Sequence, residues 1–191
     1  MFPKNYILHM KGHVPKNDCN RVINYFESHS ELHHQGFAGG KKIRDDLKKD
    51  TEIFCDFKRC DGIHWISKYL HDAASEYKKH FPTSVDLTNW NLYHVFKIQR
   101  YYPNEGYFKL HFENPGLVSD SSYDDRVFAW MIYLNDVSDG GYTEFPDQRK
   151  RYQPRTGDIL MWPAYFTHPH RGITSKTQTK YIVTGWFNFM S

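Results

Sequence analysis

The chain has 191 residues, a formal net charge of +3 at pH 7 and three cysteines. This length suits a single domain with its own core, and the small basic excess gives no reason to expect a nucleic-acid partner. No segment reaches the ~18–20 apolar residues of a membrane span, and the N-terminus lacks the apolar stretch of a secretory signal. Three cysteines without CxxC spacing argue against a disulfide framework, so we expect a cytoplasmic protein without a membrane partner.

Residues 1–85 carry the helical signals of the chain. Apolar residues recur at helical spacing in two stretches, about 17–29 and about 61–80. In the second stretch a single apolar stripe runs from Ile63 to Tyr77. We therefore expect this part of the chain to form helices that support the remainder.

After residue 85 the pattern changes to short β-rich runs separated by Gly, Pro and Asn turn signals. The expected strands are residues 90–102, 106–112, 126–134, 142–145, 158–162 and 180–189. Regular short strands of this kind indicate a sandwich or barrel with the helices packed on one face. The sequence therefore predicts one α+β domain, 1–191.

A histidine and a glutamate stand two positions apart near the end of the expected strand 106–112. Strand side chains alternate between faces, so His111 and Glu113 are expected to point the same way and form two corners of a metal site. By itself this spacing is weak evidence, because two polar residues on a solvated strand face give the same pattern.

A third ligand is available in the segment 163–172, which contains His168 and His170. Two histidines and one carboxylate form the facial triad of non-haem Fe(II) oxygenases, which leaves adjacent coordination positions open. The mixed nitrogen and oxygen set favours iron, since an imidazole-only or thiolate set would indicate copper or zinc. The residue types alone leave open which of the two histidines takes part.

From about residue 90 to the end, short motifs follow one another in a characteristic order. The series is IQRYY (98–102), GYF (106–108), HFENP (111–115), MIYLN (131–135), GGYTEF (140–145), PRTGD (154–158), WP (162–163), HRG (170–172), KY (180–181) and GWF (185–187). In this order the motifs resemble the prolyl 4-hydroxylase-type 2-oxoglutarate/Fe(II) dioxygenases, including short phage and bacterial members. The first 85 residues match this family only as helical support.

The resemblance implies a double-stranded β-helix, or jelly-roll, over residues 86–191. It also implies a basic residue about nine or ten positions after the distal histidine, where it holds the far carboxylate of 2-oxoglutarate. Lys180 lies 10 positions after His170 and 12 after His168. The expected iron ligands are therefore His111, Glu113 and His170, with His168 as a neighbour or substrate contact.

The resemblance gives further residues a role at the co-substrate. Tyr133 matches a tyrosine that shares the far carboxylate, and Tyr101 matches one near the metal-bound end, although either residue could be an ordinary core aromatic. Trp186 matches a pocket-wall tryptophan. Glu113 departs from the usual aspartate of this family by one methylene, which leaves open whether it binds iron through one oxygen or two.

The function implied is hydroxylation of a C–H bond with Fe(II), 2-oxoglutarate and O2, with ascorbate as a candidate reductant. The family favours a prolyl residue in a peptide or protein as substrate, with a small molecule as the alternative, and the sequence carries no signal of oligomeric state. Two other classes stay open: a non-catalytic jelly-roll binding module, and a cupin-like metal enzyme that does not use 2-oxoglutarate. Lys180 favours the oxygenase, because only that class needs a buried cation there.

Overall fold

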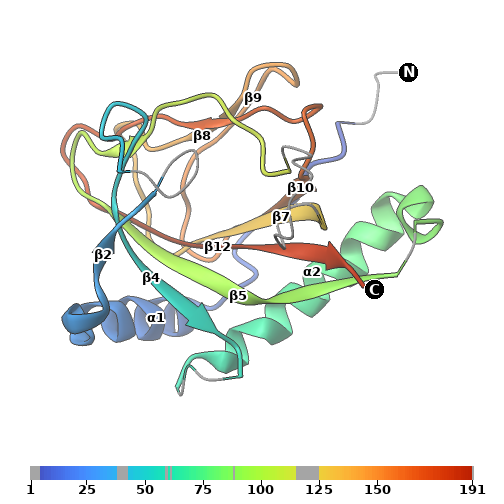
Figure 1. Ribbon diagram of the computed structural model, residues 1–191, viewed down its shortest axis with the longest axis horizontal. Helices are drawn as coiled ribbons and strands as arrows, with labels where there is room; N and C mark the ends of the chain where they lie inside the picture. The colour runs from blue at the N-terminus through green and yellow to red at the C-terminus, as the bar shows by residue number, and fades with distance from the viewer. Residues whose placement is uncertain are drawn as a thin grey trace.

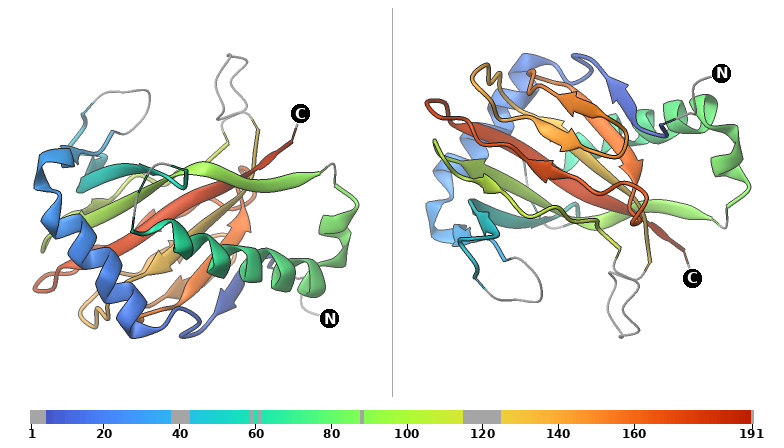
Figure 2. Two further views of the ribbon diagram at one scale, coloured as in Figure 1. Left: turned by 90° about the horizontal axis from the view of Figure 1, so that it is seen from below. Right: turned by 90° about the horizontal axis from the view of Figure 1, so that it is seen from above.

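The computed structural model describes residues 5–37, 43–58, 60, 62–87, 89–114 and 125–190. Two antiparallel sheets face each other, and two helices cover the outer face of the larger sheet (Figure 1). The view from below in Figure 2 (left) shows both helices crossing that face. We call the opposite face of the larger sheet, which looks toward the smaller sheet, the inner face. Within the described residues no helix is long and apolar enough to cross a membrane.

The larger sheet has seven strands in the order β1-β10-β7-β12-β5-β4-β2. Their bounds are β1 Leu8–Met10, β2 His34–Gln35, β4 Thr51–Asp56, β5 Trp90–Tyr101, β7 Arg126–Tyr133, β10 Ile159–Pro163 and β12 Lys180–Phe189. Every neighbouring pair is antiparallel, and β12 lies between β5 and β7. The strand that comes last along the chain therefore lies near the centre of the sheet.

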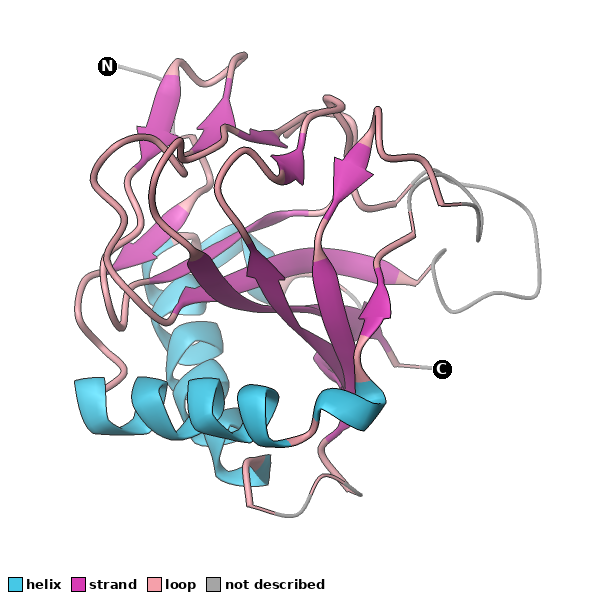
Figure 3. Cartoon of the chain, turned by 90° about the vertical axis from the view of Figure 1, so that its left-hand side faces the viewer, coloured by secondary structure: helices cyan, strands magenta, loops and turns pink. Residues whose placement is uncertain are grey.

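The smaller sheet has the order β11-β8-β9, and β3 and β6 form a two-stranded pair. Figure 3 shows short strands on the side of the larger sheet that lies opposite the helices. The bounds are β3 Lys48–Lys49, β6 Gly106–Tyr107, β8 Thr143–Phe145, β9 Lys150–Tyr152 and β11 Arg171–Gly172. An isolated antiparallel bridge joins His111 to His170. This bridge brings together two segments that lie far apart in the sequence.

The helices are α1, Lys16–Ser28, and α2, Ser67–His80, with short 3-10 turns at Ser30–Leu32, His64–Ile66 and Pro82–Val85. Both helices are amphipathic, so each buries one stripe against the sheet. Helix α1 buries Val22 and Phe26, and α2 buries Leu70 and Tyr77. The two predicted helices are confirmed, although the turn before Ser67 is 3-10 rather than α.

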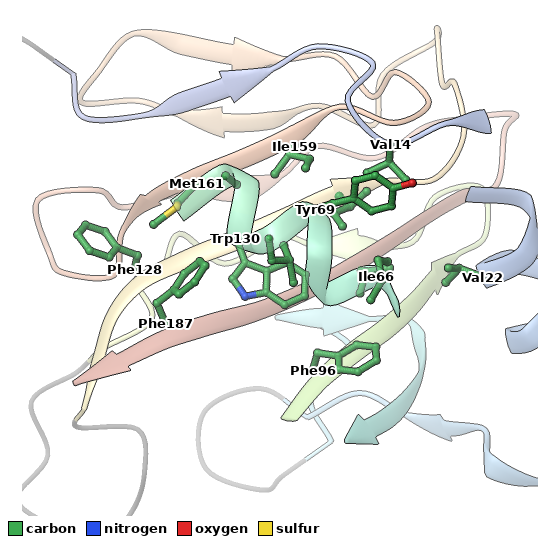
Figure 4. Close-up of a cluster of buried hydrophobic side chains, with 14 of the residues drawn as sticks. Val14, Val22, Ile66, Tyr69, Phe96, Phe128, Trp130, Ile159, Met161 and Phe187 are labelled. Atoms are coloured by element: carbon green, nitrogen blue, oxygen red, sulfur yellow. The ribbon is translucent and has the colours of Figure 1, made fainter. Parts of the chain in front are cut away.

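Side chains of the sheet alternate between two cores, as the strand period requires. On β12, Val183 and Phe187 face the helices, where they join a cluster around Trp130 and Ile66 (Figure 4). The alternate residues Ile182 and Trp186 belong to a second cluster on the inner face. The sheet is thus buried on both sides, and its inner face is available for a functional site.

The α+β class is confirmed, but two expectations about elements need correction. The first 85 residues form four strands as well as the helices, because β1, β2 and β4 extend the larger sheet and β3 pairs with β6. The expected strand 106–112 is regular only over Gly106–Tyr107 and then meets His170 at the single bridge of His111. Strands β9 and β11 were not predicted, because two or three residues are too few for a periodic signal.

Candidate metal centre

The backbone holds the two histidine segments together. The amide of His111 donates to the carbonyl of His170 at 3.0 Å, and the amide of His170 donates back to His111 at 2.8 Å. The Glu113 amide donates to the carbonyl of Ala164 at 3.0 Å. These main-chain bonds fix the positions from which the three side chains project.

The structure brings His111, Glu113 and His170 to one point. Glu113 Oε1 lies 3.5 Å from His111 Nε2 and 3.4 Å from His170 Nε2. One ligand atom from each residue lies within 4.8 Å of the others. His168 is directed elsewhere, since its Nε2 lies 2.9 Å from the carbonyl oxygen of Asn5. The structure thus brings His170, and not His168, next to Glu113.

The hydrogen bonds of the two rings decide which nitrogen faces that point. Nδ1 of His111 lies 2.8 Å from the carbonyl oxygen of Lys109, and Nδ1 of His170 lies 3.0 Å from that of His168. A carbonyl oxygen only accepts, so each Nδ1 carries a hydrogen, and in the neutral form of either ring the Nε2 lone pair is the one available to a metal ion. Two lone pairs and a carboxylate oxygen converge, which is the donor set that a divalent metal ion satisfies.

The second oxygen of Glu113 is held from the other side. Trp186 Nε1 donates to Oε2 at 2.9 Å, and Arg126 Nη1 lies 3.4 Å from the same oxygen. Burial opposes ionisation, but the contacts with His111 and His170 hold the pKa of Glu113 well below its usual range. The carboxylate thus presents a single oxygen, Oε1, to the histidines.

Aromatic rings fix the orientation of the histidines. The ring of Tyr107 stacks on His111 with centroids 3.6 Å apart and an interplanar angle of 13°. Trp162 and Phe145 pack against His170 at 5.0 and 5.3 Å. Burial first, and then the neighbouring His170, lowers the pKa of His111, which favours the neutral ring that a metal ligand requires.

Lys180 lies on the inner face at the start of β12, in register with Tyr101 of β5. It is 5% exposed, and its Nζ donates to the carbonyl of Gly141 at 3.1 Å. The ammonium lies 4.7 Å from the centroid of the Tyr101 ring. Burial lowers the pKa of Lys180 to about 8, although the charge of Asp50 works in the opposite direction.

Tyr101 and Tyr133 both lie in the inner-face cluster, as their expected roles require. The hydroxyl of Tyr133 donates to Thr143 Oγ1 at 2.6 Å, so it must turn before it can donate to a ligand. The hydroxyl of Tyr101 accepts from Gln99 Nε2 at 3.0 Å.

Sequence analysis missed a cluster of charged and polar residues on the inner face that spans β3, β4, β5 and the residue between β3 and β4. Its members are Lys48, Asp50, Glu52, Lys97 and Gln99. Positions 48, 50 and 52 alternate with period two, and so do 97 and 99. That alternation was the only available signal, because buried and solvated charges look alike in a sequence.

Comparison with known proteins gives the class. Residues 96–188 match the 2OG-Fe(II) oxygenase superfamily. A putative prolyl 4-hydroxylase of Acanthamoeba polyphaga mimivirus is 29% identical over 175 residues, which cover 79% of this chain and 66% of that protein. Prolyl 4-hydroxylase subunit alpha-1 of Homo sapiens is 26% identical over 104 residues, or 51% of this chain and 19% of that subunit.

Solved structures share the fold at low identity. The viral collagen prolyl hydroxylase of Paramecium Bursaria Chlorella virus-1 has a TM-score of 0.70 at 17% identity and covers 97% of each chain. A prolyl hydroxylase of Trichoplax adhaerens, solved with a peptide fragment of hypoxia inducible factor, has a TM-score of 0.74 at 18% identity, covering 97% of this chain and 84% of that one.

The family match identifies residues 96–188 as 2OG-Fe(II) oxygenase superfamily sequence, and the solved structures confirm the double-stranded β-helix fold. In sequence and fold the chain is similar to prolyl 4-hydroxylases. The family implies Fe(II) and 2-oxoglutarate, and the converging His111, Glu113 and His170 fit the metal.

Proposed function

We propose that residues 1–191 form one catalytic domain that hydroxylates a C–H bond, with Fe(II) held by His111, Glu113 and His170 and with 2-oxoglutarate and O2 as co-substrates. One observation carries the proposal. The face that presents the metal-binding set also presents a buried ammonium, Lys180, with no carboxylate within 4.0 Å among the described residues. A buried cation of this kind is costly unless an anion joins it.

The residues divide the work of binding and orientation. Lys180 binds the far carboxylate of the keto acid, Tyr133 shares it, and Tyr101 donates nearer the metal. Trp186 and Arg126 hold Glu113 Oε2, which leaves Oε1 as the oxygen that would bind the metal. The bound Fe(II) supplies the oxygen activation and C–H oxidation, while the protein supplies geometry and electrostatics.

We propose a prolyl residue in a peptide or protein as the substrate. The support comes from the relatives, since the mimivirus protein carries the name prolyl 4-hydroxylase and the Trichoplax enzyme was solved with a peptide. A small-molecule substrate is the alternative, and ascorbate belongs in the assay as a reductant. The three free cysteines fit a reducing compartment, so a cytoplasmic location is part of the proposal.

The direct test incubates the purified protein with Fe(II), ascorbate, 2-oxoglutarate and a panel of proline-containing peptides, and follows succinate and peptide mass. His111→Ala and His170→Ala are expected to abolish succinate formation, because each removes a metal ligand. His71→Ala, an exposed histidine of α2, is the matched control and is expected to retain activity.

The result also separates the two other classes of protein. A non-catalytic binding module forms no succinate from 2-oxoglutarate, and a cupin-like enzyme turns over its substrate without the keto acid. Succinate formation that survives in His170→Ala contradicts the ligand assignment. If succinate forms but no peptide in the panel is hydroxylated, the oxygenase proposal stands and the prolyl substrates tested are rejected.

A further inference from the structure

The cluster of charged and polar residues on the inner face is connected to the proposed co-substrate site by one side chain. Lys48 donates to Glu52 Oε2 at 2.7 Å and lies 3.1 Å from Asp50 Oδ2, while Lys97 donates to Glu52 Oε1 at 3.0 Å. These two lysines and two acids balance one another in charge. Gln99 joins this neutral cluster to Tyr101, the aromatic residue that packs against Lys180.

The amide of Gln99 can take only one orientation. Its Nε2 donates to Asp50 Oδ2 at 2.6 Å, with Glu52 Oε2 a longer contact at 3.3 Å. Its Oε1 accepts from the hydroxyl of Thr184 at 2.8 Å. Exchanging the two amide atoms would point the oxygen at two carboxylates, which only accept, so the charges of the cluster lock the amide.

The locked amide in turn orients the Tyr101 hydroxyl. Nε2 donates to the hydroxyl oxygen at 3.0 Å, so the hydroxyl hydrogen must point away from Gln99. Burial first, and then the charges of Asp50 and Glu52 together with a hydrogen bond to Asp50, raises the pKa of Tyr101 well above its usual range, so this hydrogen is retained. The ring lies beside Lys180, while the hydroxyl contacts Gln99.

We propose that Gln99 is a positioning residue for 2-oxoglutarate binding. It occupies the acceptor side of the Tyr101 hydroxyl and Oδ2 of Asp50, so that among these oxygens only Oδ1 of Asp50 competes with the co-substrate for the hydroxyl hydrogen. Without Gln99 both oxygens of Asp50 are open to the hydroxyl, and the co-substrate competes less well for its hydrogen. This inference rests on the proposed function, because it needs the keto acid to bind beside Lys180 and Tyr101.

The test compares direct binding of 2-oxoglutarate to manganese-loaded protein by calorimetry, which requires no turnover. Gln99→Met keeps the length and charge of the side chain and removes its donor and acceptor. It is expected to raise the Kd for 2-oxoglutarate about tenfold, which corresponds to one charge-assisted hydrogen bond. The stoichiometry of bound manganese is expected to stay the same, because Gln99 contacts none of the metal-binding residues.

A double-mutant cycle with Tyr101→Phe separates positioning from a general structural role. If Gln99 acts through the hydroxyl, Gln99→Met changes the Kd by less than about twofold once that hydroxyl is absent. Thr184→Val loosens the same amide and is expected to shift the Kd in the same direction but less, which keeps the test available if Gln99→Met does not fold. Gln178→Met, at a half-buried glutamine that accepts from Ser138, is the matched control and leaves the Kd unchanged.

Two results overturn the inference alone: an unchanged Kd in both Gln99→Met and Thr184→Val, or an equal loss of affinity with and without the Tyr101 hydroxyl. Failure of the unmodified protein to bind 2-oxoglutarate overturns the proposed function as well.

Discussion

A lysine buried between two sheets is costly unless its charge is compensated. Lys48 and Lys97 meet this condition through Asp50 and Glu52, whereas Lys180 donates to a backbone carbonyl. The difference distinguishes two lysines with acidic partners from Lys180, which we propose binds a carboxylate of the co-substrate. It also makes the protonation state of Lys180 part of the binding reaction.

The affinity for 2-oxoglutarate is therefore expected to depend on pH. Burial lowers the pKa of Lys180 to about 8, and only the protonated ammonium attracts a carboxylate. The kcat/KM for 2-oxoglutarate, which reports the free enzyme, should be highest below this pKa and fall as the pH rises through it. The measurement is succinate formation at limiting keto acid between pH 6.5 and 9.5.

Two variants control this prediction. Lys180→Arg keeps its charge throughout the range, so its profile is expected to stay flat near pH 8 even if its affinity is lower. Lys180→Ala should weaken binding by ~1.5–3 kcal/mol at neutral pH. A fall in kcat/KM that persists in Lys180→Arg would assign the titration to another group.

At this scale the sequence predicted residues that belong to motifs. The spacing between His170 and Lys180 distinguished His170 from its neighbour His168, because the family motif specifies the number of residues between the distal histidine and the basic residue. Gln99 and the alternating charges of β4 could not be found in this way. Their significance depends on their burial. This burial depends on β4, a strand that the sequence did not predict.

At the scale of elements, β12 is constrained by its contact with β7. The strand packs so closely against Trp130 that a Cβ at Gly185 would overlap the buried indole ring. The pairing of β12 with β5 shifts register just beyond this glycine. A small residue at position 185 is therefore a requirement of packing between neighbouring strands.

Gly185→Ala is expected to reduce the free energy of unfolding by about 1–3 kcal/mol, the usual cost of overpacking a core. Urea unfolding followed by circular dichroism measures the change. In a Trp130→Phe background the smaller ring leaves room for the methyl group, so the cost of the same substitution should shrink. An equal cost in both backgrounds would show that the loss arises from the backbone rather than from the indole.

Element boundaries were predictable where the hydrophobic period was long. Helix α1 and strands β5, β7 and β12 lie within two residues of their expected limits. Strand β4 was missed because the charged Glu52 is buried while Phe54 is exposed, so its residue types do not report its burial. The segment after Tyr107 has extended residues but only one bridge, and no local pattern reports where pairing stops.

At the scale of the whole molecule, ligand binding should be visible as stability. Ligand that binds only the folded state at about 100 times its Kd adds about 2.7 kcal/mol, which corresponds to roughly 5–10 °C in Tm for a chain of this size. We expect this shift when 2-oxoglutarate is added to manganese-loaded protein, as measured by differential scanning fluorimetry. Chelation of the metal should remove most of it.

Lys180→Ala at the same ligand concentration serves as the control and should show a clearly smaller shift. A full shift in that variant would mean that the keto acid binds elsewhere. The size of the shift in unmodified protein also tests whether folding and binding involve the same unit, since the two sheets enclose the inner face while α1 and α2 pack on the outer face of the larger sheet.

The central place of β12 has a consequence for biosynthesis. A nascent chain that has reached residue 179 possesses β4 with β5 and β7 with β10, but these are two half-sheets with unpaired inner edges. Only when β12 leaves the ribosome can it enter the gap and join them, and it brings Lys180 and Trp186 with it. Folding of this region is therefore a late event, and fragments that stop before β12 should be prone to aggregate.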